Sequence, residues 1–401
     1  MDILSRRNKE YTRAAEVRAA GIYPFFRAIE SEQDTVVTIN GKKVLMFGSN
    51  SYLGLTNHPK VEEAAIKATK KYGTGCAGSR FLNGTLDIHV ELEKKIAKFI
   101  GKDDAIVFST GFQVNVGVIP AITRNGDYII MDKLNHASLI EGGKLSAAHK
   151  IRYRHNDMKS LEQRLQMANE RIAQTGREQL KLIVMDGIFS MDGDIAKLDE
   201  ISDLAKQYNA IVMVDDAHSL GVIGKNGAGT ASHFGLTDEV RLIMGTFSKS
   251  LATIGGFIAS DAETIDYLRH FARSILFSAS IAPGNTAAAS AALDIIINEP
   301  ERREKLWENT NYAIDKFKDL GIDVGLTETP VIPVYIRDDE KTFRITKMLF
   351  DDGVFVNPVI APAVAPEDSL LRFSLMATHT IDQVEEAIEK IHKHGKTLGV
   401  F

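Results

Sequence analysis

The sequence has little cysteine, no long hydrophobic run and no large excess of one charge. Its single cysteine among 401 residues, Cys76, excludes an intramolecular disulfide and a cysteine-rich metal site. No uncharged run reaches the roughly 18 residues that a membrane-spanning helix needs. The formal net charge of −5 does not favour a protein that binds nucleic acid.

The remaining composition is ordinary for a globular protein. Hydrophobic residues make up 44% of the chain and charged residues 25%. A chain of this length can bury a large core without disulfides. The N-terminal residues are charged and lack the apolar stretch of a signal peptide. We therefore expect a soluble cytoplasmic protein.

Changes in pattern along the chain predict three parts. Residues 1–45 are expected to form an arm, with a polar helix, an aromatic cluster in GIYPFFRAIES and a hairpin around Asn40-Gly41. Residues 46–285 alternate short apolar runs with amphipathic helices, which indicates a large domain. Residues 286–401 are helix-rich with short strands, as in a smaller α+β domain.

The large domain is predicted to be of the α/β class. Five short apolar runs are typical of buried strands, at residues 105–109, 128–131, 182–186, 211–215 and 241–246. Helical patterns lie between them, for example at 87–101, where Asp87 could cap the helix, and at 197–209. Strands that alternate with helices predict a mostly parallel sheet covered on both faces.

Polar groups follow the predicted strands one after another. In open α/β sheets, ligands bind beyond the carboxyl ends of the strands. The first strand leads into Thr110-Gly111-Phe112, where a helix N-terminus can offer backbone N–H groups to a phosphate. His136 and Ser190 follow the second and third strands. One such turn alone is more often an ordinary strand–helix connection, but five in succession indicate a site.

Asp215 and Lys249 point to the kind of ligand. Asp215 ends an apolar strand, where a carboxylate is costly unless a cation such as a pyridinium nitrogen pairs with it. His218 follows in the next loop and could hydrogen-bond a phenolic oxygen on the same ring. Lys249 stands among small and hydroxylated residues in GTFSKSLATIGG, a setting in which a lysine can form a Schiff base. Together with a phosphate turn, these residues indicate pyridoxal 5'-phosphate.

Simpler interpretations exist for each residue. Asp215 could cap the following turn, and Lys249 could pair with an acidic neighbour on a surface loop. Two other ligand classes are rejected. The glycine-rich segment 73–85 lacks the Gly-Lys-Ser/Thr ending of a nucleotide-binding loop. The 11 histidines show no HExxH or paired spacing, so no metal site is expected.

Seven motifs carry a resemblance to a known family. They are SNSYLGL, GTGCAGSRFLNGT, STGFQVN, NHASLIEG, DGIFSMDGDIAKL, VDDAHSLGVIGKNGAGT and GTFSKSLATIGG. From about residue 15 to 395, the chain resembles the α-oxoamine synthases, which are fold-type I pyridoxal phosphate enzymes. The resemblance implies a fold-type I transferase with a mostly parallel, helix-covered sheet and a smaller C-terminal α+β domain. It also implies a decarboxylating condensation of an amino acid with an acyl-CoA.

The resemblance implies a role for each candidate residue. Lys249 would hold the cofactor covalently and act as the base, Asp215 would pair with the pyridine nitrogen, and His136 would stack on the ring. The implied cofactor-binding residues are Gly111, Phe112, His136, Ser190, Asp215, His218, Thr246, Lys249 and Ser278. The implied substrate-binding residues are Asn50, Ser79, His136 and Arg372, of which Arg372 would bind the amino-acid carboxylate.

The resemblance also implies partners. It suggests a homodimer with shared active sites, in which Ser278 reaches the phosphate bound by the other subunit. The stretches GTFSKSL, DDGVFVNPV and LLRFSLMATHT are most similar to the branch that condenses L-serine with a long-chain acyl-CoA such as palmitoyl-CoA. That reaction yields 3-ketodihydrosphingosine, in the first step of sphingolipid synthesis.

Several alternatives stay open. Other members of the family use glycine or alanine with a short or dicarboxylic acyl group. An aminotransferase and a non-enzymatic binding protein are more distant alternatives. The sequence leaves open the acyl chain length and a contact with the inner membrane face. The aromatic side chains Tyr23, Phe25 and Phe26 could line an acyl channel, rest on lipid or simply pack.

Overall fold

The chain forms two compact units. The structure, a computed structural model, describes residues 1–361 and 363–401. The larger unit comprises residues 50–190 and 194–306, and the smaller comprises residues 1–49, 191–193 and 307–401. The division into an arm, a large domain and a small domain stays a prediction.

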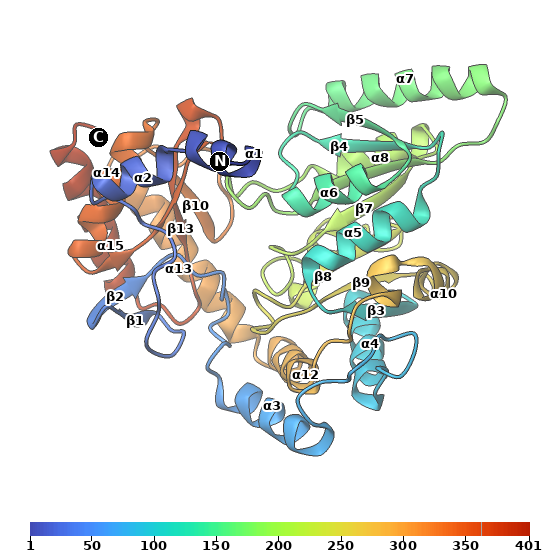
Figure 1. Ribbon diagram of the computed structural model, residues 1–401, viewed down its shortest axis with the longest axis horizontal. Helices are drawn as coiled ribbons and strands as arrows, with labels where there is room; N and C mark the ends of the chain where they lie inside the picture. The colour runs from blue at the N-terminus through green and yellow to red at the C-terminus, as the bar shows by residue number, and fades with distance from the viewer. Residues whose placement is uncertain (362) are drawn as a thin grey trace. The chain divides into compact units, whose positions relative to one another are not determined.

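A seven-stranded sheet organises the larger unit (Figure 1), with the strand order β5-β4-β6-β7-β8-β9-β3. Strands β5, β4, β6, β7 and β8 are mutually parallel, and β9 runs antiparallel to both of its neighbours. The strands are β3 (Asp104–Phe108), β4 (Tyr128–Asp132), β5 (His149–Tyr153), β6 (Lys181–Asp186), β7 (Ile211–Asp215), β8 (Leu242–Thr246) and β9 (Gly256–Ser260).

The larger unit, all of whose residues are described, also contains eleven helical segments. They are α3 (Pro59–Tyr72), α4 (Asp87–Ile100), α5 (Gly111–Ile122), α6 (Ala137–Leu145), α7 (Met158–Thr175), α8 (Leu198–Gln207), η1 (Lys225–Gly227), α9 (Thr230–His233), α10 (Ala262–Phe271), α11 (Arg273–Leu276) and α12 (Pro283–Asn298). Some of these segments connect and cover the strands, whereas α3 and α12 pack mainly against each other. Helix α13 (Pro300–Asp319) contains residues of both units.

Both faces of the large sheet are buried. Alternate strand residues such as Ile106, Ile129 and Leu182 join one core cluster with residues of α5, α6, α10 and α11. The intervening residues, such as Val107 and Ile130, are equally buried. Helices α4, α7 and α8 contact the strands without contributing to that cluster. This double cover explains why the strands are near-continuous apolar runs.

The predicted mostly parallel α/β sheet is therefore confirmed. All five predicted strands are present, shifted by at most one residue at an end. The sequence interpretation missed β5, whose HKIRY sequence lies largely exposed at the sheet edge, and β9. The cap prediction was wrong: Leu86 is the N-cap residue of α4, and Asp87 is already its first residue.

The smaller unit contains two three-stranded sheets, ordered β1-β2-β11 and β10-β13-β12. The strands are β1 (Val36–Ile39), β2 (Lys42–Met46), β10 (Val331–Tyr335), β11 (Val354–Phe355), β12 (Asn357–Val359) and β13 (Leu370–Ser374). Its helices, besides part of α13, are α1 (Ile3–Glu10), α2 (Arg13–Ala19), α14 (Asp339–Asp351), η2 (Pro366–Asp368) and α15 (Ile381–Thr397).

The N-terminal residues match the sequence interpretation in part. The hairpin is confirmed, because β1 and β2 pair around Asn40 and Gly41, whose φ angles are 51° and 71°. The single polar helix is in fact two helices, α1 and α2, and neither has a buried residue. Within the described ranges, no helix combines the length and the apolar character that crossing a bilayer requires.

Candidate active site

The carboxyl ends of β3, β4, β6, β7 and β8 surround a cavity of about 320 Å³ in the larger unit. They lie at one edge because β3 and β8 both run antiparallel to β9, which gives all five strands the same direction. The cavity falls within the usual size range of small-molecule sites. Its lining comprises Thr110, Gly111, Phe112, His136, Ser138, Asp186, Asp215, Ala217, His218, Met244, Thr246, Ser248, Lys249, Ile254 and Gly255.

The N-terminus of α5 forms one wall of this cavity. Thr110 is the N-cap residue, and its hydroxyl accepts the backbone N–H of Gln113 at 3.1 Å. The N–H groups of Gly111 and Phe112 belong to the first helical turn, which has no carbonyl acceptor within the helix. A Cβ atom on Gly111 would lie 2.6 Å from Oγ1 of Thr246, so the close approach here requires glycine. Backbone N–H groups beside a threonine hydroxyl suit a phosphate.

Asp215 is buried at the end of β7, with 2% of its surface exposed. Its Oδ2 atom accepts the side-chain N–H of Asn115 at 2.7 Å, and its Oδ1 atom accepts the backbone N–H of Ala217 at 3.0 Å. Asn115 also donates to the hydroxyl of Ser138 at 2.8 Å. The Asn115 amide and the Ala217 N–H are neutral donors, so they hold the Asp215 carboxylate in place and leave its negative charge uncompensated. That charge is available to pair with a cationic ring nitrogen.

His218 is oriented by Tyr52. The tyrosine hydroxyl lies 2.6 Å from Nδ1 of His218, and both residues are buried. Sequence reasoning did not assign Tyr52 or Asn115 to the site. The available signals were a tyrosine within SNSYLGL and the polar Asn115 among the apolar residues of the helix after Gly111.

His136 is the N-cap residue of α6 and lines the cavity. Its Nδ1 atom lies 2.7 Å from the hydroxyl of Ser138, and its backbone N–H donates to Oδ2 of Asp186 at 2.7 Å. Burial lowers the pKa of His136, the charge of Asp215 opposes this shift, and the charge of Lys249 adds to it. A neutral imidazole is suited to stacking on an aromatic ring.

Lys249 lies in the connection between β8 and β9, and its half-buried side chain lines the cavity. A backbone hydrogen bond from Ala252 to the Lys249 carbonyl, at 2.9 Å, closes a turn there. The cavity thus brings together an anion site, a buried carboxylate and a lysine. Those three groups match the phosphate, ring nitrogen and aldehyde of pyridoxal phosphate. The described residues contain no cluster of His, Cys, Asp or Glu suited to a metal ion.

Seven of the candidate residues predicted from the sequence meet at this cavity: Gly111, Phe112, His136, Asp215, His218, Thr246 and Lys249. Among the described residues, Asn50, Ser79, Ser190 and Ser278 are not part of its lining. Ser278 lies beside the first turn of α5, where its hydroxyl accepts from the Gln113 amide at 3.3 Å. Oδ1 of Asn50 and Oγ of Ser79 are buried and have no hydrogen-bond partner among the described residues.

Arg372 belongs to the smaller unit, on β13. It is buried, with 4% of its surface exposed, and its Nη1 atom donates to the hydroxyl of Ser374 at 2.6 Å. A guanidinium is seldom buried to this extent unless it is paired. Its assignment as the carboxylate-binding residue stays a prediction.

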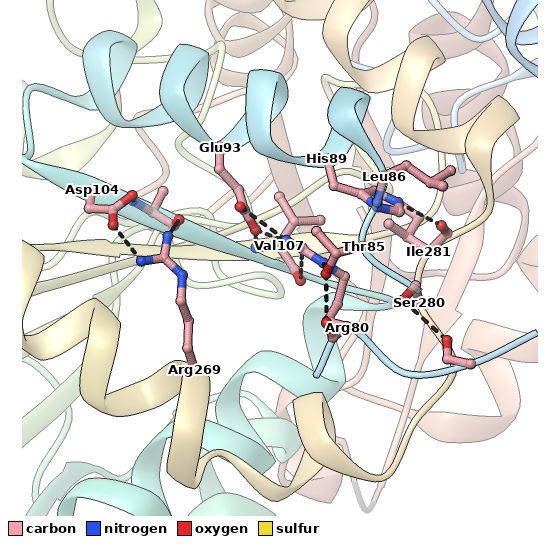
Figure 2. Close-up of polar contacts among 12 residues, drawn as sticks. Arg80, Thr85, Leu86, His89, Glu93, Asp104, Val107, Arg269, Ser280 and Ile281 are labelled. Carbon is pink, nitrogen blue, oxygen red and sulfur yellow. Dashed lines mark hydrogen bonds and ion pairs between the residues drawn. The ribbon is translucent and has the colours of Figure 1, made fainter. Parts of the chain in front are cut away.

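The glycine-rich segment 73–85, which carries Ser79, is held by a polar network (Figure 2). The Arg80 guanidinium binds both carboxylate oxygens of Glu93 on α4, at 2.7 and 3.1 Å. Oε1 of Glu93 also accepts the backbone N–H of Val107 on β3, at 2.8 Å. His89 of α4 caps the Leu86 N–H at 3.0 Å and contacts the Ile281 carbonyl at 3.0 Å. The segment is therefore attached to both a helix and the sheet.

Comparisons with known proteins agree with this geometry. The sequence matches the aminotransferase class I and II family over residues 42–391. It is 58% identical to a serine palmitoyltransferase of Sphingobacterium spiritivorum, over 97% of this chain and 96% of that protein. It is 44% identical to an 8-amino-7-oxononanoate synthase of Petrotoga mobilis, over 95% of this chain and 96% of that protein.

A solved structure covers the whole chain. It is a serine palmitoyltransferase variant from S. paucimobilis with a bound PLP–myriocin aldimine, and it superimposes with a TM-score of 0.95 at 34% identity, covering 100% of both chains. The fold, the lysine-containing cavity and these relatives agree on a pyridoxal phosphate enzyme. The chain belongs to the aminotransferase class I and II family of fold-type I pyridoxal phosphate enzymes and, within it, to the α-oxoamine synthases.

Proposed function

We propose that this chain condenses L-serine with a long-chain acyl-CoA, the reaction expected of a serine palmitoyltransferase. The observation that carries the proposal is the cavity in which Lys249, Asp215 and the N-terminus of α5 converge. The choice of substrates is supported by the relatives, because identity to serine palmitoyltransferase exceeds identity to 8-amino-7-oxononanoate synthase.

Each residue of the cavity has a distinct task in this proposal. When bound, pyridoxal phosphate supplies an electron sink for the carbanion formed at the amino-acid Cα. Lys249 takes the Cα proton as general base and later returns a proton to the product. Asp215, fixed by Asn115, keeps the proton on the ring nitrogen. His136, neutral and anchored at the start of α6, covers one ring face.

The remaining candidates bind and orient the ligands. Gly111, Phe112 and Thr246 would hold the phosphate and His218 would bind the ring hydroxyl, whereas Ser190, which is outside the cavity lining, is assigned a place beside the cofactor by the family resemblance alone. Arg372 binds the serine carboxylate, since a guanidinium fork matches a carboxylate. Asn50 and Ser79 line the substrate side. The buried Oδ1 atom of Asn50 could accept a hydrogen bond from a ligand, and the buried hydroxyl of Ser79 could donate or accept one, because neither atom has a partner among the described residues.

The overall reaction is balanced without a further reactant. A carbon–carbon bond forms between Cα of serine and the acyl carbon, the coenzyme A thiol leaves, and the carboxyl group departs as CO₂. The product is 3-ketodihydrosphingosine when the acyl group is palmitoyl, which assigns the enzyme to sphingolipid synthesis.

Assembly and location complete the proposal. We infer a homodimer with shared active sites, in which Ser278 of one subunit contacts the phosphate bound in the other. A cytoplasmic location, expected from the sequence, stays a prediction. So does a peripheral contact with the membrane.

The test is an assay of coenzyme A release by the purified enzyme. L-serine, glycine and L-alanine are each combined with acyl-CoA thioesters of two to eighteen carbons and with pimeloyl-CoA. We expect release only with L-serine and long acyl chains, with a 3-keto amine found by mass spectrometry. Preferential use of alanine with pimeloyl-CoA would assign the chain to the 8-amino-7-oxononanoate synthases instead.

A further inference from the structure

A second buried carboxyl group lies beside Asp215. Asp186 ends β6 as Asp215 ends β7, and the two residues are paired neighbours in the parallel register. They are 3% and 2% exposed, respectively, and both line the cavity. Two carboxyl groups side by side in a low-dielectric setting do not both ionise readily. The roles proposed above use Asp215 and leave Asp186 without a task.

Asp186 has one contact that reaches the reacting region. Its Oδ2 atom accepts the backbone N–H of His136 at 2.7 Å. The connection that follows β4 ends at His136, which is the N-cap residue of α6. Asp186 therefore fixes the peptide from which the His136 ring projects, across about 50 residues of sequence. This ring also depends on Ser138, whose hydroxyl lies 2.7 Å from Nδ1.

The electrostatic surroundings favour the neutral form of Asp186. Burial raises the pKa of Asp186 well above its usual value, and the charge of Asp215 raises it further. Asp132 acts in the same direction, whereas the His136 N–H and the charge of Lys249 oppose the shift. An ionised Asp186 would compete with Asp215 for the proton of the cofactor nitrogen.

We propose that Asp186 is a positioning residue that stays protonated, holds the His136 peptide in place and leaves the negative charge of the cavity at Asp215. The proposal rests on the proposed function, because it assigns a purpose to the placement of His136 against the cofactor. Asp186 acts through His136 and takes no proton from the substrate.

Two substitutions separate the hydrogen bond from the charge. Asp186→Asn resembles the protonated carboxyl and keeps an oxygen for the His136 N–H. Asp186→Leu is also neutral but removes that acceptor. Asp127→Asn is the matched control, because Asp127 is a buried carboxyl at the amino end of β4 that accepts backbone N–H groups from Arg124 and Leu180. It tests the loss of a buried carboxylate away from the cavity.

The first measurement is cofactor affinity, obtained by titrating each protein with pyridoxal phosphate and following absorbance. We expect Asp186→Asn to remain within threefold of the wild type and Asp186→Leu to lose at least tenfold. The spectral change on adding L-serine should persist in Asp186→Asn and be lost in Asp186→Leu. Equal losses in both variants, or wild-type behaviour of Asp186→Leu, would overturn the proposal.

The second measurement is thermal stability against pH, on the holoenzyme. A carboxyl with a raised pKa stabilises the fold at low pH, and this contribution is lost as pH rises through the folded-state pKa. The Tm of Asp186→Asn minus the Tm of the wild type should therefore increase by at least about 2 °C as pH rises from 5 to 8. Asp127→Asn should show no such gain. If the Tm of Asp186→Asn minus the Tm of the wild type stays constant or falls as pH rises, Asp186 is ionised and the proposal is overturned.

The cofactor titration and the pH series use no substrate, and these two readouts decide the assignment of Asp186. A failure of the coenzyme A assay with L-serine would thus refute the proposed substrates and leave the assignment of Asp186 standing. If Asp186→Leu does not fold, the pH comparison of Asp186→Asn with the wild type still decides between a neutral and an ionised carboxyl.

Discussion

Arg80 and Glu93 form a bidentate ion pair, and their side chains are only 9% and 4% exposed. The same glutamate accepts a backbone N–H from β3. The pair thus joins the glycine-rich segment that carries Ser79 to the sheet that forms the cavity. Because both partners are shielded from water, removing one of them leaves an uncompensated charge inside the protein.

Replacing Arg80 by Met should therefore destabilise the fold by about 3–5 kcal/mol. Denaturant unfolding followed by circular dichroism measures this loss. The double variant Arg80→Met/Glu93→Leu should recover most of it, because no buried charge is left alone. Lys144→Met, which removes an exposed ion pair with Glu141, is the control and should cost less than about 1 kcal/mol. A loss of similar size in the single and double variants would contradict this view.

Asn115 should matter for cofactor binding although it is not part of the cavity lining among the described residues. Asn115→Leu removes the donor that holds Oδ2 of Asp215, and a hydrogen bond to a charged group contributes about 1.5–3 kcal/mol. We expect cofactor affinity to fall roughly 10- to 100-fold in an absorbance titration. Thr123→Val, which alters another buried polar residue directly after the far end of α5, should leave the affinity unchanged.

Lys249 should be the residue that holds the cofactor covalently. Borohydride reduction followed by peptide mapping should place a pyridoxyl group on Lys249 in the wild type. In Lys249→Ala this adduct should be absent. Lys225→Ala, which changes an exposed lysine, should retain it in full. Persistence of the adduct in Lys249→Ala at full yield would mean that another lysine carries the cofactor.

Arg372 should determine affinity for serine and not for the cofactor. In Arg372→Ala, we expect serine affinity to fall by at least about tenfold, the order expected for a charge-assisted pair. Arg372→Lys should recover only part of the loss, because an ammonium cannot form two parallel hydrogen bonds. Arg337→Ala serves as the exposed control. Serine-induced absorbance changes give the affinity, and unchanged serine binding in Arg372→Ala would remove its proposed role.

His155 should make stability depend on alkaline pH. Burial would lower the pKa of His155, but hydrogen bonds to Asp132 and Asp194 outweigh it and raise the pKa to about 10. The contribution is complete below about pH 6.5 and is lost as pH rises toward 10. The Tm difference between the wild type and His155→Gln should therefore shrink across that range. His149→Gln, at an exposed histidine, is the control, and a pH-independent difference for His155→Gln would contradict the assignment.

The sequence predicted the elements whose signals are local. Apolar runs marked β3, β4, β6, β7 and β8, and the polar residues after them marked the cavity, because strands of one direction end at one edge. The direction of β9 and its insertion between β8 and β3 could not be predicted from a local pattern, because a short apolar strand has the same sequence pattern whether it pairs in parallel or antiparallel.

The supporting residues of the site were missed for a related reason. Asn115 meets Asp215 across 100 residues of sequence, and Tyr52 meets His218 across 166. Such pairs exist only after the fold has brought distant elements together. Asp186 is visible in the sequence as the last residue of a predicted strand. Its raised pKa, however, depends partly on the charge of Asp215 in the neighbouring strand, and the order of the strands in the sheet had to be known before the two could be paired.

The pairing of β2 with β11 has a consequence for biosynthesis. Leu45 and Met46 lie opposite Val354 and Phe355 in a parallel ladder, so the central strand of this sheet is translated long before its third strand. At about 5–20 residues per second, the roughly 300 intervening residues take the ribosome about 15–60 s. During that interval the nascent β1–β2 hairpin presents an open edge to other chains. The smaller unit can therefore close only after translation has nearly finished, and a stalled or truncated chain would display this edge to chaperones.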